Sequence, residues 1–86
     1  MTPLEKVAVF LMIAGVEKGR GIIALMDDSE IKAVVPAIRR LTAVSREMQA
    51  SVAAEFAELG YEDDMSPSAA LTVIRVLFDG RKIRGR

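Results

Sequence analysis

The sequence contains no cysteine, histidine or tryptophan among its 86 residues, and only 5% of the residues are aromatic. The absence of cysteine excludes disulfides, thiolate metal sites and cysteine nucleophiles. The absence of histidine removes the usual general base near neutral pH. It also leaves carboxylates, which favour Mg²⁺ or Ca²⁺ over zinc, as the main metal ligands. The composition therefore predicts a protein that is not an enzyme and has no cofactor and no resident metal.

Two acidic segments and one glycine-rich segment are the remaining candidates for chemistry. The acidic segments, 27–30 and 62–64, lack the spacing of a calcium-binding loop. Gly15, Gly19 and Gly21 are not followed by the Gly-Lys-Ser/Thr of a phosphate-binding loop. We predict that residues 27–30 cap a helix and that residues 62–64 form a solvated loop. Gly15 is predicted to end a helix, and Gly19 and Gly21 to allow another helix to approach closely.

The charges are unevenly distributed, although the formal net charge is zero. Four of the 12 basic residues lie in segment 81–86, whereas all 12 acidic residues precede it. The acidic body argues against nucleic acid as the main partner. The basic, glycine-containing segment 81–86 is predicted to be a flexible tail.

Apolar residues make up 51% of the chain, and the mean hydropathy is +0.28. The run Val7–Ala14 is too short to cross a bilayer, which needs about 20 residues, and a cytoplasmic protein is expected. Part of the apolar surface is expected to stay exposed until a partner protein covers it. The alternative is that the 12 alanines raise the apolar count.

Cap residues and apolar periodicity predict five short helices. Thr2, Ser45 and Ser66 precede three of them, and Pro36 predicts a kink or break near Val35. The first segment also contains β-branched residues, so a strand is the competing prediction there. The expected helices cover residues 3–14, 17–26, 29–41, 45–59 and 67–79.

These helices predict an all-α domain over residues 1–80. Short helices joined by brief loops stack into bundles or superhelices. The expected architecture is a compact, armadillo-like, right-handed superhelical bundle.

In order and spacing, the helices resemble the FliG N-terminal domain family of the bacterial flagellar motor switch. The opening Leu4–Gly15 matches the family's lysine, long apolar run and closing glycine. Further likeness lies in the acidic helix start at Ser29, the Val44-Ser45 cap and the last helix before Gly80. Pro36 departs from the family pattern. No segment here corresponds to the family's middle and C-terminal domains, so this chain is not expected to generate torque.

The resemblance implies a docking module at the inner face of the cell membrane, in the flagellar basal body. Its implied partner is the cytoplasmic C-terminal tail of FliF, the membrane-ring protein, together with neighbouring copies in a ring. Contact with the membrane would be indirect, and no small-molecule substrate is implied. We predict a groove on the first and last helices, with the alternative that the same residues are ordinary core. The predicted groove residues are Phe10, Ile13, Val73, Val76 and Leu77.

Two other functions stay open. The N-terminal domain of MgtE-type magnesium transporters has a related helical superhelix, and it would use the acidic loops to respond to Mg²⁺. A stand-alone adapter would bind some other amphipathic helix. The sequence separates this adapter poorly from the flagellar module.

Overall fold

The computed structural model describes residues 1–41 and 43–84, and within them every regular element is an α-helix. The all-α prediction is therefore confirmed, and the competing strand is wrong. The armadillo-like superhelix stays a prediction. The helices are α1 (Pro3–Ala14), α2 (Val16–Ile23), α3 (Asp28–Arg40), α4 (Arg46–Glu58) and α5 (Pro67–Val76).

The predicted caps begin three of the helices. At α1, Thr2 Oγ1 accepts from the Glu5 N–H at 3.2 Å, and the Glu5 carboxylate accepts from the Thr2 N–H at 2.9 Å. Ser45 and Ser66 accept from Met48 and Ala69 in the same way. Each cap satisfies backbone donors that the first helical turn leaves unpaired, so local sequence alone defines these helix starts.

Helix α2 ends earlier than predicted, and α3 begins one residue earlier. After Ile23 the chain tightens, with the Leu25 and Met26 N–H groups bonded to carbonyls three residues back. Asp27 then caps α3 by a reciprocal pair of hydrogen bonds with Glu30. The capping prediction for this acidic segment is confirmed.

Pro36 does not break α3, so the predicted break is wrong. The helix runs through Pro36 from Asp28 to Arg40. Pro36 is exposed, whereas Val34 and Ala37 beside it are buried against the core. Proline removes one backbone hydrogen bond and crowds the preceding turn, but packing of the opposite face onto α1 holds the helix together.

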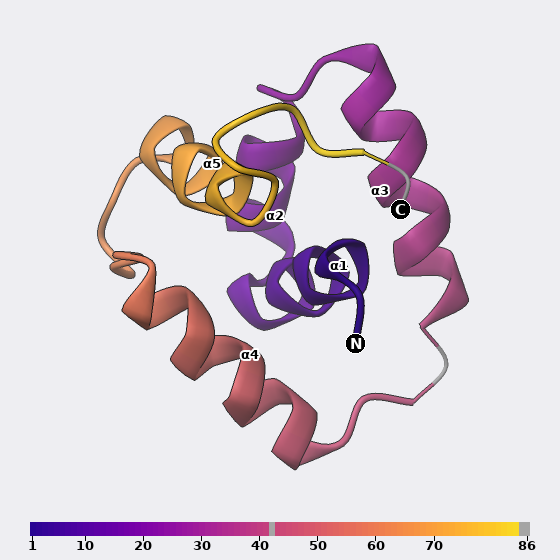
Figure 1. Cartoon of the computed structure of the whole chain (residues 1–86), viewed down its shortest axis with the longest axis vertical. Coiled ribbons are helices and arrows are strands. Elements are labelled where there is room, and N and C mark those ends of the chain that lie inside the picture. The colour runs from indigo at the N-terminus through magenta and orange to yellow at the C-terminus, as the bar shows by residue number, and fades with distance from the viewer. Residues whose placement is uncertain (42, 85–86) are drawn as a thin grey trace.

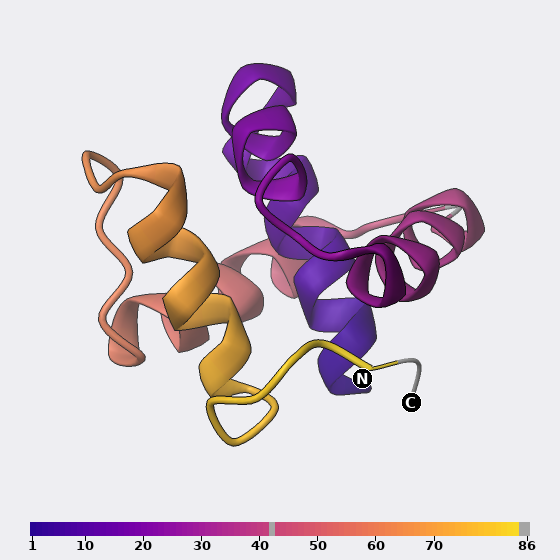
Figure 2. The same cartoon turned by 90° about the horizontal axis from the view of Figure 1, so that it is seen from above.

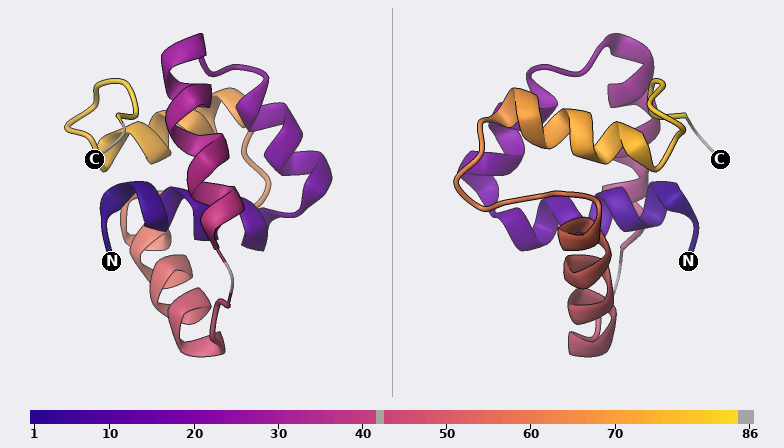
Figure 3. Two further views of the ribbon diagram at one scale, coloured as in Figure 1. Left: turned by 90° about the vertical axis from the view of Figure 1, so that its right-hand side faces the viewer. Right: turned by 60° about the vertical axis from the view of Figure 1, so that its left-hand side comes forward.

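Helix α1 lies at the centre of the molecule, with the other helices around it (Figure 1). It packs against α2, α3 and α4, while α5 packs against α2. Five consecutive residues of α1, Val7–Leu11, are buried. The apolar run therefore supplies the core helix of the domain, as expected for a helix that is apolar on nearly all sides. Figure 3 shows α4 projecting from the end opposite the α2–α3 turn.

Residues 81–84, called the C-terminal strap below, lie against α3. After α5 the chain reverses at Asp79 and Gly80, which have φ of +59° and +76°, and then runs toward α3 (Figure 2). Ile83 is only 2% exposed, and Lys82 forms an ion pair with Asp27 at 2.7 Å. The packed domain thus extends beyond residue 80, where only a flexible tail had been predicted. The last two residues of that predicted tail lie outside the described residues.

None of the described helices combines the length and the apolar character that crossing a bilayer requires.

Candidate functional site

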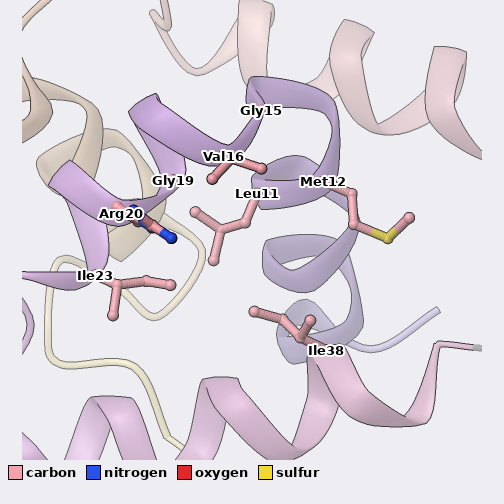
Figure 4. Close-up of a pocket in the computed structure, with 8 residues that line it drawn as sticks. All are labelled: Leu11, Met12, Gly15, Val16, Gly19, Arg20, Ile23 and Ile38. Carbon is pink, nitrogen blue, oxygen red and sulfur yellow. The ribbon is translucent and has the colours of Figure 1, made fainter.

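An apolar groove opens where α1, α2 and α3 meet, with a volume of about 420 Å³. Leu11, Ile23 and Ile38 converge on it from the three helices (Figure 4). Among the described residues that line the groove, Arg20 alone is charged. These residues are Leu11, Met12, Gly15, Val16, Gly19, Arg20, Ile23 and Ile38.

Two large apolar side chains at this groove are unusually exposed. Val16 is 72% exposed and Met12 is 51% exposed. Single exposed apolar residues are common on proteins, but here they border a concave apolar surface. Such a surface is typical of a protein-interaction site. Leu25, which follows α2, is also half exposed.

Gly15 shapes the corner of the groove between α1 and α2. Its φ of +96° and ψ of +169° belong to a region that is essentially restricted to glycine. Its N–H bonds to the Leu11 carbonyl, and its own carbonyl accepts from the Gly19 N–H at 2.8 Å. The two helices therefore turn at Gly15 with almost no intervening loop, and this turn brings Val16 beside α1.

Replacing Gly15 by Ala should lower the free energy of unfolding by about 2 kcal/mol, because an alanine is strained in this conformation. No atom lies within 4 Å of the added methyl group, so the cost is in the backbone rather than in a clash. Gly19→Ala is the matched control. Gly19 is helical, and the added methyl would meet only the Leu11 carbonyl at an ordinary 3.6 Å. Urea unfolding should show Gly19→Ala as neutral or more stable; equal losses in both variants would contradict the strain.

The glycine prediction is confirmed at α2. A Cβ at Gly21 would lie 3.1 Å from the Pro67 side chain of α5, so glycine allows α5 to approach closely. Gly19 faces the Leu11 backbone in the same way, at a looser distance.

The predicted groove residues of α1 fall on the side facing α4. Phe10 is buried, with its ring centroid 4.3 Å from Phe56 and 4.7 Å from Tyr61. Ile13 is 39% exposed. Both line a second hollow of about 370 Å³, whose other walls come from α4 and residues 61–63.

The predicted groove residues of α5 do not join this hollow. Val73 is buried, Val76 is 44% exposed, and Leu77 is half-buried. None of them lines the hollow beside α4 or the groove at α1–α2–α3. The structure therefore brings Phe10 and Ile13 together, and separates them from the α5 residues.

Sequence reasoning missed the groove at α1–α2–α3. No sequence pattern singled out Met12, Val16, Ile23 or Ile38 as a contact residue. One feature of the sequence could have indicated the groove: the apolar residue Val16 directly follows Gly15, at the start of a helix that contains two glycines. Pattern alone could not show that α2 and α3 leave this side of α1 uncovered.

A buried carboxylate links three segments near the other end of α3. Glu30 is fully buried, and its two oxygens accept from Arg75 Nε at 2.9 Å and Nη2 at 2.6 Å. It also accepts from the N–H groups of Asp27 and Ile83. The Arg75 hydrogen bonds hold the pKa of Glu30 below its usual value despite burial, and they raise the pKa of Arg75.

Hydrogen bonds and an ion pair also engage the acidic residues of segment 27–30, which had been candidates for metal binding. Lys82 lowers the pKa of Asp27, whose own carboxylate raises the pKa of Lys82. In the described part of the chain, no three acidic side chains gather as metal ligands would. Ser29 Oγ donates to Asp27 Oδ1 at 2.8 Å and so takes part in the cap.

Comparison with known proteins identifies a family. The family model for the FliG N-terminal domain matches residues 1–80. No curated protein and no solved structure matches the chain.

Proposed function

The chain belongs to the FliG N-terminal domain family of the flagellar motor switch, and from this membership we propose that it docks onto the cytoplasmic C-terminal tail of FliF. Proteins of this family are structural components of the flagellar motor on its cytoplasmic side, and the family is not a known enzyme family. Docking on FliF would place the domain at the inner face of the membrane. Contact between neighbouring copies around a ring belongs to the same proposal.

The groove at α1–α2–α3 is the observation that carries this proposal. Helix-in-groove recognition needs an apolar channel that receives side chains spaced by three or four residues from one face of a partner helix. The exposed side chains of Val16 and Met12 border such a channel, and Leu11, Ile23 and Ile38 line it. An amphipathic segment of the FliF tail would cover apolar surface that the isolated domain leaves in water.

Arg20 supports a partner helix with an acidic residue beside its apolar face. It lies along the groove, and none of the ion pairs among residues 1–41 and 43–84 involves it. A carboxylate on the partner would fix the orientation of the docked helix, because charge pairs at the rim contribute specificity more than affinity.

The test is titration of a FliF-tail peptide into the protein and into two matched variants. Val16→Asp places a charge in the groove, whereas Val76→Asp places the same charge on the exposed face of α5. We expect Val16→Asp to weaken binding by at least about thirtyfold, as loss of a central apolar contact does. We expect Val76→Asp to change binding by less than about twofold. Calorimetry measures both, and circular dichroism checks folding.

The reverse result would move the docking site to the residues first predicted on α1 and α5. Weak binding by Val76→Asp with unchanged binding by Val16→Asp would favour Val76 and Leu77 as contacts. No binding by the unmodified, folded domain would contradict docking on FliF and favour an adapter for another helix.

A further inference from the structure

The two walls of the groove are connected mainly through α1. Helix α2 packs on α5 and on α1, whereas α3 packs on α1. A direct α2–α3 pair is not among the main contacts. The relative position of α2 and α3, which form the two walls of the groove, therefore depends on α1 and on the corner between them, residues 24–27.

The C-terminal strap holds this corner. Its Lys82 pairs with Asp27, the N-cap of α3, at 2.7 Å. Its Ile83 is buried in the core, and the Ile83 N–H donates to Glu30 Oε2 at 3.0 Å. Arg75 at the end of α5 binds the same carboxylate through two hydrogen bonds. The strap and Arg75 thus join the end of α5 to the first turn of α3.

Near its opposite end, α3 contributes Ile38 to the lining of the groove. Ile38 lies eight residues after Glu30, which is about 12 Å along a helix. Because α3 is continuous from Asp28 to Arg40, a change of tilt at Glu30 moves Ile38 relative to Ile23 on α2. The distance between those side chains sets the width of the groove.

We propose that the C-terminal strap is a latch that controls the groove: when residues 81–84 are docked on α3, the groove is set to receive a partner helix, and when they are released, it loosens. This inference rests on the proposed function for the identity of the partner helix. The coupling is reciprocal, so a helix bound in the groove tightens the strap. Anything that draws the strap away from α3 weakens binding without touching the groove.

The experiment uses two strap variants and one control in the full chain. Ile83→Ser removes the buried anchor, and Lys82→Ala removes the ion pair. Arg81→Ala is the control, because it also removes one positive charge from the strap, but Arg81 takes part in none of the ion pairs among residues 1–41 and 43–84. Three readouts are compared: hydrogen exchange of the residue 83 amide, methyl NMR shifts of Ile23 and Ile38, and affinity for the FliF-tail peptide.

We expect Ile83→Ser to lower protection of the residue 83 amide about tenfold or more. The Ile38 and Ile23 methyl signals should move, and affinity should fall about fivefold, which is the low end of allosteric coupling. Lys82→Ala should change the three readouts in the same direction by smaller amounts. It serves as the test if Ile83→Ser fails to fold. The control Arg81→Ala should leave all three readouts unchanged.

Loss of amide protection with unchanged methyl signals and affinity would overturn the latch, as would an amide that keeps its protection in Ile83→Ser. If the peptide binds none of the proteins, the proposed function fails. The methyl signals of the free domain then decide the latch by themselves.

Discussion

Replacing Arg75 by Met is expected to lower the free energy of unfolding by about 3 kcal/mol at pH 7, because it leaves the buried Glu30 carboxylate without its cation. Glu30 has no solvent exposure, and Arg75 supplies two of its four hydrogen bonds. We place the loss at the lower end for a buried pair, since the Arg75 side chain is 31% exposed. Urea unfolding measures it.

The matched control is Lys6→Met. Lys6 forms another long-range ion pair, with Glu55 at 2.9 Å, but the side chains of both residues are partly exposed. Exposed pairs contribute about 0–1 kcal/mol, so this variant should lose much less stability. Equal losses in the two variants would show that burial of Glu30 does not set the cost.

The cost of Arg75→Met should depend on pH in a defined direction. The folded pKa of Glu30 is lowered from its ordinary value of 4.5. The pair therefore contributes fully above about pH 4.5, and the contribution is lost as the pH falls through the folded pKa. In the variant, burial without the cation raises the pKa of Glu30 instead. The stability difference between the two proteins should thus shrink as the pH falls from above 4.5, where Glu30 of the variant takes up its proton, through the lowered folded pKa of Glu30. A constant difference would contradict this account.

Replacing Phe10 by Ala should lower the free energy of unfolding by about 3–4 kcal/mol, as expected for deleting a buried phenylalanine. The Phe10 ring stacks on Phe56 at 4.3 Å and meets the edge of Tyr61 at 4.7 Å. Its loss removes both aromatic contacts and leaves a cavity between α1 and α4. Thermal unfolding measures the loss, and the near-ultraviolet signal of the single tyrosine reports on the packing.

This variant also separates the two roles considered for Phe10. Ile13→Ala, on the same helix but 39% exposed, serves as the control and should cost about 1 kcal/mol or less. A small stability loss in Phe10→Ala together with lost binding of the FliF-tail peptide would support Phe10 as a groove residue. A large loss of stability with unchanged affinity in the remaining folded protein would assign it to the core.

Much of the helical framework could be predicted because its signals are local. Thr2, Ser45 and Ser66 each satisfy backbone donors within three residues. Burial of most of the apolar run of α1 was also expected, and its residues Val7–Leu11 lie in the core. The break predicted at Pro36 was wrong because the cost of a proline can be seen in the local sequence. The packing of α3 on α1, which outweighs that cost, depends on residues far apart in the chain.

The sequence by itself determined an all-α domain, its caps and its family, because these depend on residue type and on spacing along the chain. Tertiary structure alone decided which apolar residues face water. Phe10 and Met12 belong to the same apolar run, yet α4 covers the first and no described helix covers the second. Tertiary structure also decided that Ile83 is buried, since its partners lie on α3, more than 50 residues earlier. Spacing along a chain defines the face of a helix, but only packing determines whether another segment covers that face.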